Sequence, residues 1–142
     1  MTIGILKEPI PETRVSMIPE HIAILKKWNV QVFIESNAGV TAFANDDKYT
    51  DAGAVVKSRE EVLQNSDLIL SINPLPQSET VSLKSKVLLG VFQPLFNAQL
   101  MKDWSSKGLT VFSMDMLPRT TRAQSMDILS SQANIAGYKA VL

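Results

Sequence analysis

Short apolar runs alternate along the chain with polar stretches in which apolar residues recur at helical spacing. The apolar runs are rich in Val, Ile, Leu and Phe, and the branched and aromatic residues among these favour strands. Such an alternation is typical of β-α units and of a mainly parallel sheet. It predicts one α/β domain with a doubly wound, mainly parallel sheet of flavodoxin-like or Rossmann-like kind. The predicted strands cover residues 3–6, 30–34, 54–56, 68–72, 87–92 and 109–113.

Proline, glycine and capping residues mark the helix boundaries between these runs. Proline suits a first helical turn, so a helix is expected to begin near Pro19. Ser58 followed by Glu61 has the spacing of a capping box and predicts the start of another helix. Two further helices are expected, one over residues 40–52 with Gly53 as its stop, the other capped by Asn97, running to residue 107 and ended by Gly108.

Composition agrees with a single soluble domain and removes several kinds of site. With 142 residues and a hydrophobic fraction of 45%, the chain can bury a sizeable core. Fourteen basic and fourteen acidic residues cancel, which favours neither a nucleic acid nor an anionic membrane as partner. Without cysteine and with one histidine, no metal site is expected. Because the N-terminus lacks a long apolar run, we expect an intracellular domain without signal peptide or membrane span.

The glycine-rich turns that hold nucleotide phosphates are missing from the sequence. Neither G-x-G-x-x-G nor G-x-x-x-x-G-K-[ST] occurs, and the turn after the first predicted strand reads "LKEPIPE". A doubly wound domain that binds a dinucleotide by itself normally carries such a turn there. This domain alone is therefore not expected to hold a dinucleotide tightly. The single histidine, His21, has no partner residue in view and is expected to be a surface or partly buried residue rather than a general base.

Three loops rich in proline and polar residues follow predicted strands, where ligands of doubly wound sheets bind. They read "KEPIPETR", "NPLP" and "DMLPRTTR", after the first, fourth and last strands. The first two can also be explained by turn chemistry alone. The third leads into a segment in which polar side chains recur in steps of three and four residues.

That closing segment combines side chains suited to a ligand with both an anionic group and a hydroxyl or amide group. Arg119 can bind a phosphate or carboxylate, Gln124 both donates and accepts, and Asp127 accepts from hydroxyls. Thr121 and Gln124 have capping-box spacing, so a helix is expected to begin there. This helix would carry Gln124, Asp127 and Ser130 on one face. On residue types alone, a solvated helix face with an arginine–Asp127 ion pair is the alternative interpretation.

The residues "PRTTRAQSMDILSSQANIAGYKAVL" closely resemble the segment that ends the N-terminal domain of the α subunit of proton-translocating NAD(P) transhydrogenase. The opening "IGILKEPIPETRVSMIPE" resembles the start of the same family, which includes alanine dehydrogenase. In this family the domain packs beside a Rossmann domain, and NAD(H) lies in the cleft between the two. The resemblance implies that Arg119, Gln124, Asp127 and Ser130 contact the nicotinamide and its ribose.

The resemblance also implies a domain division and a role in a larger assembly. Residues 1–126 would form the N-terminal domain, and residues 127–142 would begin the helix that links it to the NAD-binding Rossmann domain. The implied reaction is hydride transfer between NAD(H) here and NADP(H) on a separate component, coupled to proton translocation. The implied partners are the NADP-binding and membrane components and a second copy of the subunit, with the assembly cytoplasmic and peripheral to the inner membrane.

Direct hydride transfer needs no protein acid or base, because the cofactor carries the chemistry. No catalytic residue is therefore assigned, and the domain's expected task is to orient the nicotinamide ring. The 142-residue chain alone is expected to be inactive.

Two other functions stay open on the sequence. One is the substrate domain of an alanine dehydrogenase-like enzyme, a class that carries a substrate lysine after the fourth strand and a histidine after the next. Asn73 stands in place of that lysine and "VFQPLFN" holds no histidine, so pyruvate amination is not expected, although Arg14 is shared by both families. The other is a non-catalytic interaction domain. Within the transhydrogenase pattern, Ser71 replaces a frequent lysine and "FQPLFN" replaces a more usual Trp-Pro-Ala-Gln-Asn.

Overall fold

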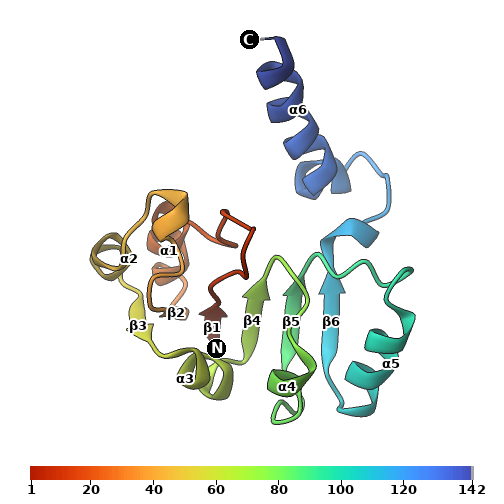
Figure 1. Ribbon diagram of the computed structural model, residues 1–142. Helices are drawn as coiled ribbons and strands as arrows, with labels where there is room; N and C mark the ends of the chain where they lie inside the picture. The colour runs from red at the N-terminus through yellow and green to blue at the C-terminus, as the bar shows by residue number, and fades with distance from the viewer. Residues whose placement is uncertain (142) are drawn as a thin grey trace.

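The computed structural model describes residues 1–141 and consists of a sheet with helices on both faces (Figure 1). All neighbouring strands pair in parallel, in the order β3-β2-β1-β4-β5-β6. The predicted doubly wound α/β fold is confirmed, and its strand order is that of a Rossmann sheet rather than a flavodoxin-like one. The strands are β1 (Thr2–Ile5), β2 (Gln31–Glu35), β3 (Val55–Lys57), β4 (Leu68–Ser71), β5 (Val87–Gly90) and β6 (Thr110–Ser113).

Side-chain caps explain where two of the helices begin. The Ser58 hydroxyl accepts from the Glu61 N–H at 3.3 Å and the Glu61 carboxylate accepts from the Ser58 N–H at 3.0 Å, so the predicted capping box is formed. The helix expected over residues 40–52 is divided in two, because Asn45 caps its second part by accepting from the Lys48 N–H. The helices are α1 (Pro19–Lys26), α2 (Asp46–Ala52), α3 (Arg59–Asn65), α4 (Gln77–Thr80), α5 (Ala98–Ser106) and α6 (Ile128–Val141), with 3₁₀ turns η1 (Val40–Ala42), η2 (Met114–Met116) and η3 (Ala123–Met126).

The two predicted glycine stops are confirmed, but the predicted side-chain cap at Asn97 is not formed. Gly53 and Gly108 follow α2 and α5 with positive φ values of 101° and 70°, the conformation that makes glycine a common helix stop. Asn97 precedes α5 as predicted, but its side chain does not cap the helix. Its Nδ2 instead donates to the carbonyl of Phe92 at 2.8 Å, and this bond ties the helix start to the loop after β5.

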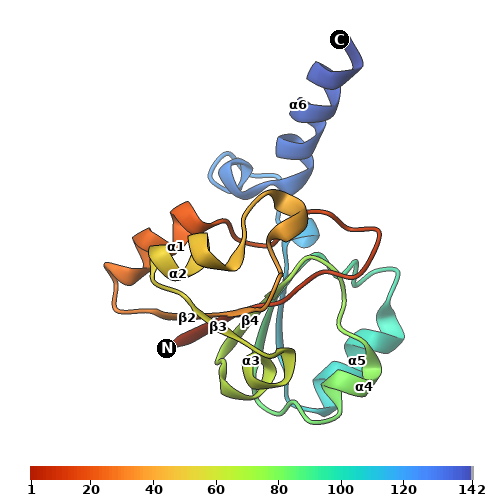
Figure 2. The same ribbon diagram turned by 60° about the vertical axis from the view of Figure 1, so that its left-hand side comes forward.

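The sheet separates two apolar cores, one on each face. Figure 2 shows α1 and α2 on one side of the sheet and α3, α4 and α5 on the other. Ile5 and Ile34 belong to the first core, which also holds the fully buried Tyr49 of α2. Phe33 and Trp104 belong to the second. Successive residues of a strand point to opposite faces, so Phe33 and Ile34 of β2 can serve different cores.

The last segment differs from the prediction. Helix α6 begins at Ile128, not near Thr121, and the residues before it form the 3₁₀ turn η3 followed by an extended Asp127 with φ −75° and ψ 106°. The turn forms because the Thr120 carbonyl accepts from both the Ala123 and the Gln124 N–H, at 3.0 and 3.1 Å. Thr121 therefore makes no capping box, and Gln124 and Asp127 do not share a helical face with Ser130.

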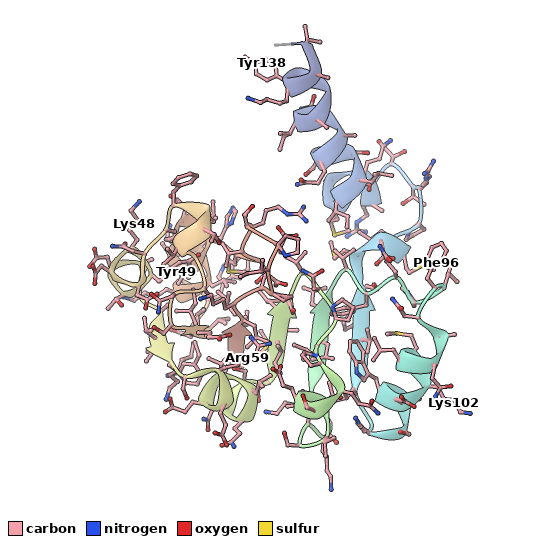
Figure 3. All side chains as sticks on the ribbon, viewed as in Figure 1. Lys48, Tyr49, Arg59, Phe96, Lys102 and Tyr138 are labelled. Carbon is pink, nitrogen blue, oxygen red and sulfur yellow. The ribbon has the colours of Figure 1, made fainter. Side chains whose placement is uncertain are left out.

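Helix α6 stands apart from the rest of the molecule. In Figure 1 it rises away from the carboxyl end of the sheet, and none of its residues is buried. Tyr138, near its end, points away from the domain (Figure 3) and is 70% exposed. Within residues 1–141, no helix is long and apolar enough to span a bilayer.

Candidate functional site

The crevice in which Rossmann domains hold a dinucleotide is filled by the protein itself. In this strand order the topological switch point lies between β1 and β4. The carboxylate of Glu8, a residue that is only 7% exposed, occupies this point. It accepts from the N–H groups of Ile72 and Asn73, at 2.5 and 3.0 Å, and from the Asn73 Nδ2 at 3.0 Å. These amide donors are of the kind that binds phosphate oxygens, and here an internal carboxylate already satisfies them.

The acidic residue at the end of β2 is also engaged internally. Rossmann domains that bind NAD use an acidic residue in this region to bind a ribose hydroxyl. Glu35 instead accepts from Arg59 Nη1 at 2.7 Å and from the Lys7 N–H at 2.8 Å. Arg59 also makes a two-bond contact to Glu79, at 2.8 and 2.9 Å. Thus the amide donors at the switch point and the acidic residue at the end of β2 both make contacts within the domain instead of facing a ligand.

Glu8→Gln is expected to lower the free energy of unfolding by about 2 kcal/mol, because a buried amide would face donors that now bind a carboxylate. Urea denaturation followed by tryptophan fluorescence measures this change, since Trp104 is fully buried in the core. Glu20→Gln is the matched control, because Glu20 is exposed on α1. Equal denaturation midpoints for the two variants would show that the Glu8 contacts do not stabilise the fold.

A cleft of about 630 Å³ lies instead beside the carboxyl end of β6, between the sheet and α6. Its walls come from η2, the loop after it, η3 and the first turns of α6. All four predicted site residues, Arg119, Gln124, Asp127 and Ser130, line this cleft. The structure therefore brings them together from three segments, although not along one helix. Their contact with a cofactor stays a prediction.

Asp127 lines the cleft and caps helix α6. Its Oδ1 accepts from the Leu129 N–H at 3.0 Å, which is the bond of a helix cap, and its Oδ2 accepts from the Ser130 hydroxyl at 2.7 Å. The Ser130 hydroxyl, and after it the backbone N–H groups of Leu129 and Ser130, hold the pKa of Asp127 below its usual value. The positive charge of Arg119 adds a smaller lowering. Asp127 is therefore a carboxylate at neutral pH.

Arg119 and Gln124 keep their side chains available for a ligand. Both are exposed, and within residues 1–141 neither side chain makes a hydrogen bond or an ion pair. The arginine–Asp127 ion pair of the alternative interpretation is therefore not formed in the described part of the chain, because Asp127 accepts its hydrogen bonds from its own helix. A guanidinium and a carboxamide without internal partners can bind an anion, a carbonyl or a hydroxyl group.

Sequence reasoning missed two polar residues of the cleft, Asp115 and Gln132. Asp115 follows β6 directly within η2, so the rule that ligands bind at strand ends pointed to its loop but not to this side chain. Gln132 lies one turn into α6. Its position became clear only once the helix was seen to begin at Ile128.

Arg14 and Asn73, which the family resemblance associates with amino-acid binding, are both held by internal contacts. Arg14 binds Glu12 through Nε and Nη2, at 2.8 and 2.6 Å, and this contact lowers the pKa of Glu12 to about 2. Asn73, in the place of the substrate lysine, is held by Glu8 at 3.0 Å. Neither side chain lines the cleft beside β6.

Comparison with known proteins gives these features a context. Over its whole length the chain is 39% identical to the NAD(P) transhydrogenase subunit alpha of Cereibacter sphaeroides, of which it spans 28%. A solved transhydrogenase from Sinorhizobium meliloti superposes with a TM-score of 0.93 at 36% identity, covering 99% of this chain and 43% of that one. A solved L-alanine dehydrogenase superposes with a TM-score of 0.78 at 27% identity, covering 86% of this chain and 34% of the other.

The model of the alanine dehydrogenase/PNT N-terminal domain matches residues 4–136, almost the entire chain. This match confirms the resemblance noted in the sequence. The TM-score and the sequence identity are both higher for the solved transhydrogenase than for the solved alanine dehydrogenase. The chain spans less than half the length of the relatives it matches. By this match, the chain belongs to the alanine dehydrogenase/PNT N-terminal domain family.

Proposed function

We propose that this domain positions the nicotinamide of NAD(H) for hydride exchange with NADP(H) held by a separate component, in a reaction coupled to proton translocation. The observation that carries the proposal is the convergence of Arg119, Gln124, Asp127 and Ser130 on one cleft. The similarity to NAD(P) transhydrogenase α subunits supports it.

The donors and acceptors of the cleft fit a nicotinamide riboside. Its carboxamide offers a carbonyl acceptor and an NH2 donor, and its ribose offers hydroxyls. Arg119 and Gln124 supply donors for the carbonyl, while Asp127 and Gln124 supply acceptors for the NH2 and hydroxyl groups. Bound NAD(H) would supply the hydride chemistry, and these side chains would hold the ring in one orientation.

The rest of the dinucleotide needs a second domain. Glu8 fills the switch point and Glu35 is bound by Arg59, so this domain offers no pyrophosphate or adenosine site of the Rossmann kind. In the proposal, a following Rossmann domain binds that half, and α6 begins the linking helix. The small residues Ala133, Ala136 and Gly137 of α6 would allow close contact with it.

The proposal includes the assembly that the relatives' names indicate. They are called subunits, and we place this domain in a homodimeric NAD(H)-binding component. NADP-binding and membrane components would complete the enzyme and hold it at the cytoplasmic side of the inner membrane. Alone, the chain would not transfer hydride. Asn73, which stands in place of the substrate lysine and is bound by Glu8, argues against the substrate domain of an amino-acid dehydrogenase.

Calorimetric titration of this chain with NADH is expected to give no measurable heat or only very weak binding, because it contributes only the nicotinamide half of the site. The same titration of the complete NAD(H)-binding component is the control and is expected to show clear binding. Micromolar affinity in the 142-residue chain would contradict the division of the site between two domains.

A further inference from the structure

A second carboxylate faces the cleft and has no place in the proposed set of cofactor contacts. Asp115 lies in η2, directly after β6, and lines the cleft together with Arg119 and Gln124. The Ser113 hydroxyl donates to its Oδ1 at 2.5 Å. In the described residues, no hydrogen bond reaches its Oδ2, so this oxygen can accept one from a ligand.

Ser113 connects Asp115 to the rigid interior. Its hydroxyl donates a hydrogen bond to Asp115, and the same oxygen accepts one from the Phe92 N–H at 2.9 Å. Phe92 is fully buried and packs edge-on against Trp104, with the ring centroids 5.2 Å apart. Ser113 is also the last residue of β6. The orientation of the Asp115 carboxylate is therefore set by the sheet and the core, which is how pre-organised binding residues are supported.

The two carboxylates of the cleft differ in how their oxygens are engaged, although each oxygen of Asp127 keeps a second lone pair for a ligand. Both oxygens of Asp127 already accept hydrogen bonds, from the Leu129 N–H and the Ser130 hydroxyl. Asp115 has one oxygen engaged and one open. An ionised carboxylate can only accept, so the open oxygen selects a hydroxyl or N–H donor on the ligand.

We propose that Asp115 is a further cofactor-binding residue, which accepts a hydrogen bond from a ribose hydroxyl or the carboxamide NH2 of NAD(H). Ser113 is then a positioning residue, which acts by holding Asp115. This inference rests on the proposed function, because it takes its ligand from it. Asp115→Asn would keep an acceptor for Ser113 but present an NH2 where the cofactor also presents donors.

Amide NMR spectra of the complete NAD(H)-binding component, titrated with NADH, test the proposal. Asp115→Asn is expected to weaken NADH binding roughly tenfold, as for loss of one hydrogen bond to a charged group, without lowering the melting temperature. Asp103→Asn, on α5 away from the cleft, is the matched control and should bind like the wild type. Ser113→Ala should weaken binding and lower the melting temperature, and Ser113→Thr should restore both.

The NMR outcomes distinguish a failure of the Asp115 proposal from a failure of the proposed function. If NADH shifts the amide signals of Gln124 and Ser130 equally in the wild type and in Asp115→Asn, the role of Asp115 is overturned and the proposed function stands. If NADH shifts no signal from the cleft of the complete wild-type component, the proposed function fails, and the role of Asp115 fails with it.

Discussion

Asp127→Asn, in the complete enzyme of the proposed function, is expected to slow hydride transfer roughly a hundredfold, the cost of a misplaced reactant. NADH affinity should change much less. Asparagine is a good helix cap and can still accept from the Leu129 N–H, so α6 should begin where it does now. What the variant loses is the negative charge that holds the Ser130 hydroxyl and faces the cleft. Stopped-flow measurement of hydride transfer, with NADH binding measured separately, distinguishes the two effects.

The neighbouring arginines provide a matched pair for the same experiment. Arg119 lines the cleft, whereas Arg122 is exposed and does not. Arg119→Ala should therefore slow hydride transfer strongly, and Arg122→Ala should leave the rate near that of the wild type. Neither change removes a side-chain hydrogen bond in the described part of the chain, so folding should be unaffected. A rate that is unchanged in both Asp127→Asn and Arg119→Ala would reject the assignment of this cleft to the nicotinamide.

Gly90→Ala is expected to prevent stable folding. An added Cβ would lie 1.9 Å from the Ser71 carbonyl oxygen and 2.6 Å from the ring of Phe92. The first contact is with the backbone of the neighbouring strand, which cannot move without breaking the β4–β5 pairing. Overpacking of a core costs about 1–3 kcal/mol in milder cases, so this change should exceed that range and remove much of the stability of a small domain. Circular dichroism and thermal melting measure the loss.

Gly137→Ala is the control for that substitution. Nothing lies within 4 Å of a Cβ added there, on the exposed helix α6. Alanine favours a helix over glycine by about 1 kcal/mol, so helix content should rise slightly and the melting of the domain should stay the same. Similar melting temperatures for the two alanine variants would show that the close packing at Gly90 is not needed.

Most of the fold could be predicted because its rules are local. Val, Ile and Leu runs mark the strands, and the capping box of Ser58 and Glu61 forms as its spacing indicates. The prediction failed where two local patterns competed. Thr121 and Gln124 have capping-box spacing, but the adjacent Thr120 closes a 3₁₀ turn with its carbonyl, and Asp127 becomes the residue that caps α6. Spacing alone does not tell which of several nearby polar residues will satisfy the free N–H groups of a helix.

By itself, the sequence determined the alternation of strands and helices, the absence of a glycine-rich phosphate turn, and the four polar residues of the proposed nicotinamide site. Only the tertiary structure decided the order of the strands, which depends on how distant strands pair. It also showed that Glu8 fills the switch point by reaching Ile72 and Asn73, more than sixty residues away. The role of Asp115 depends in the same way on Phe92, which lies on another strand-end loop. Contacts between residues far apart in the chain leave no periodic pattern, so they become visible only when the sheet brings those residues together.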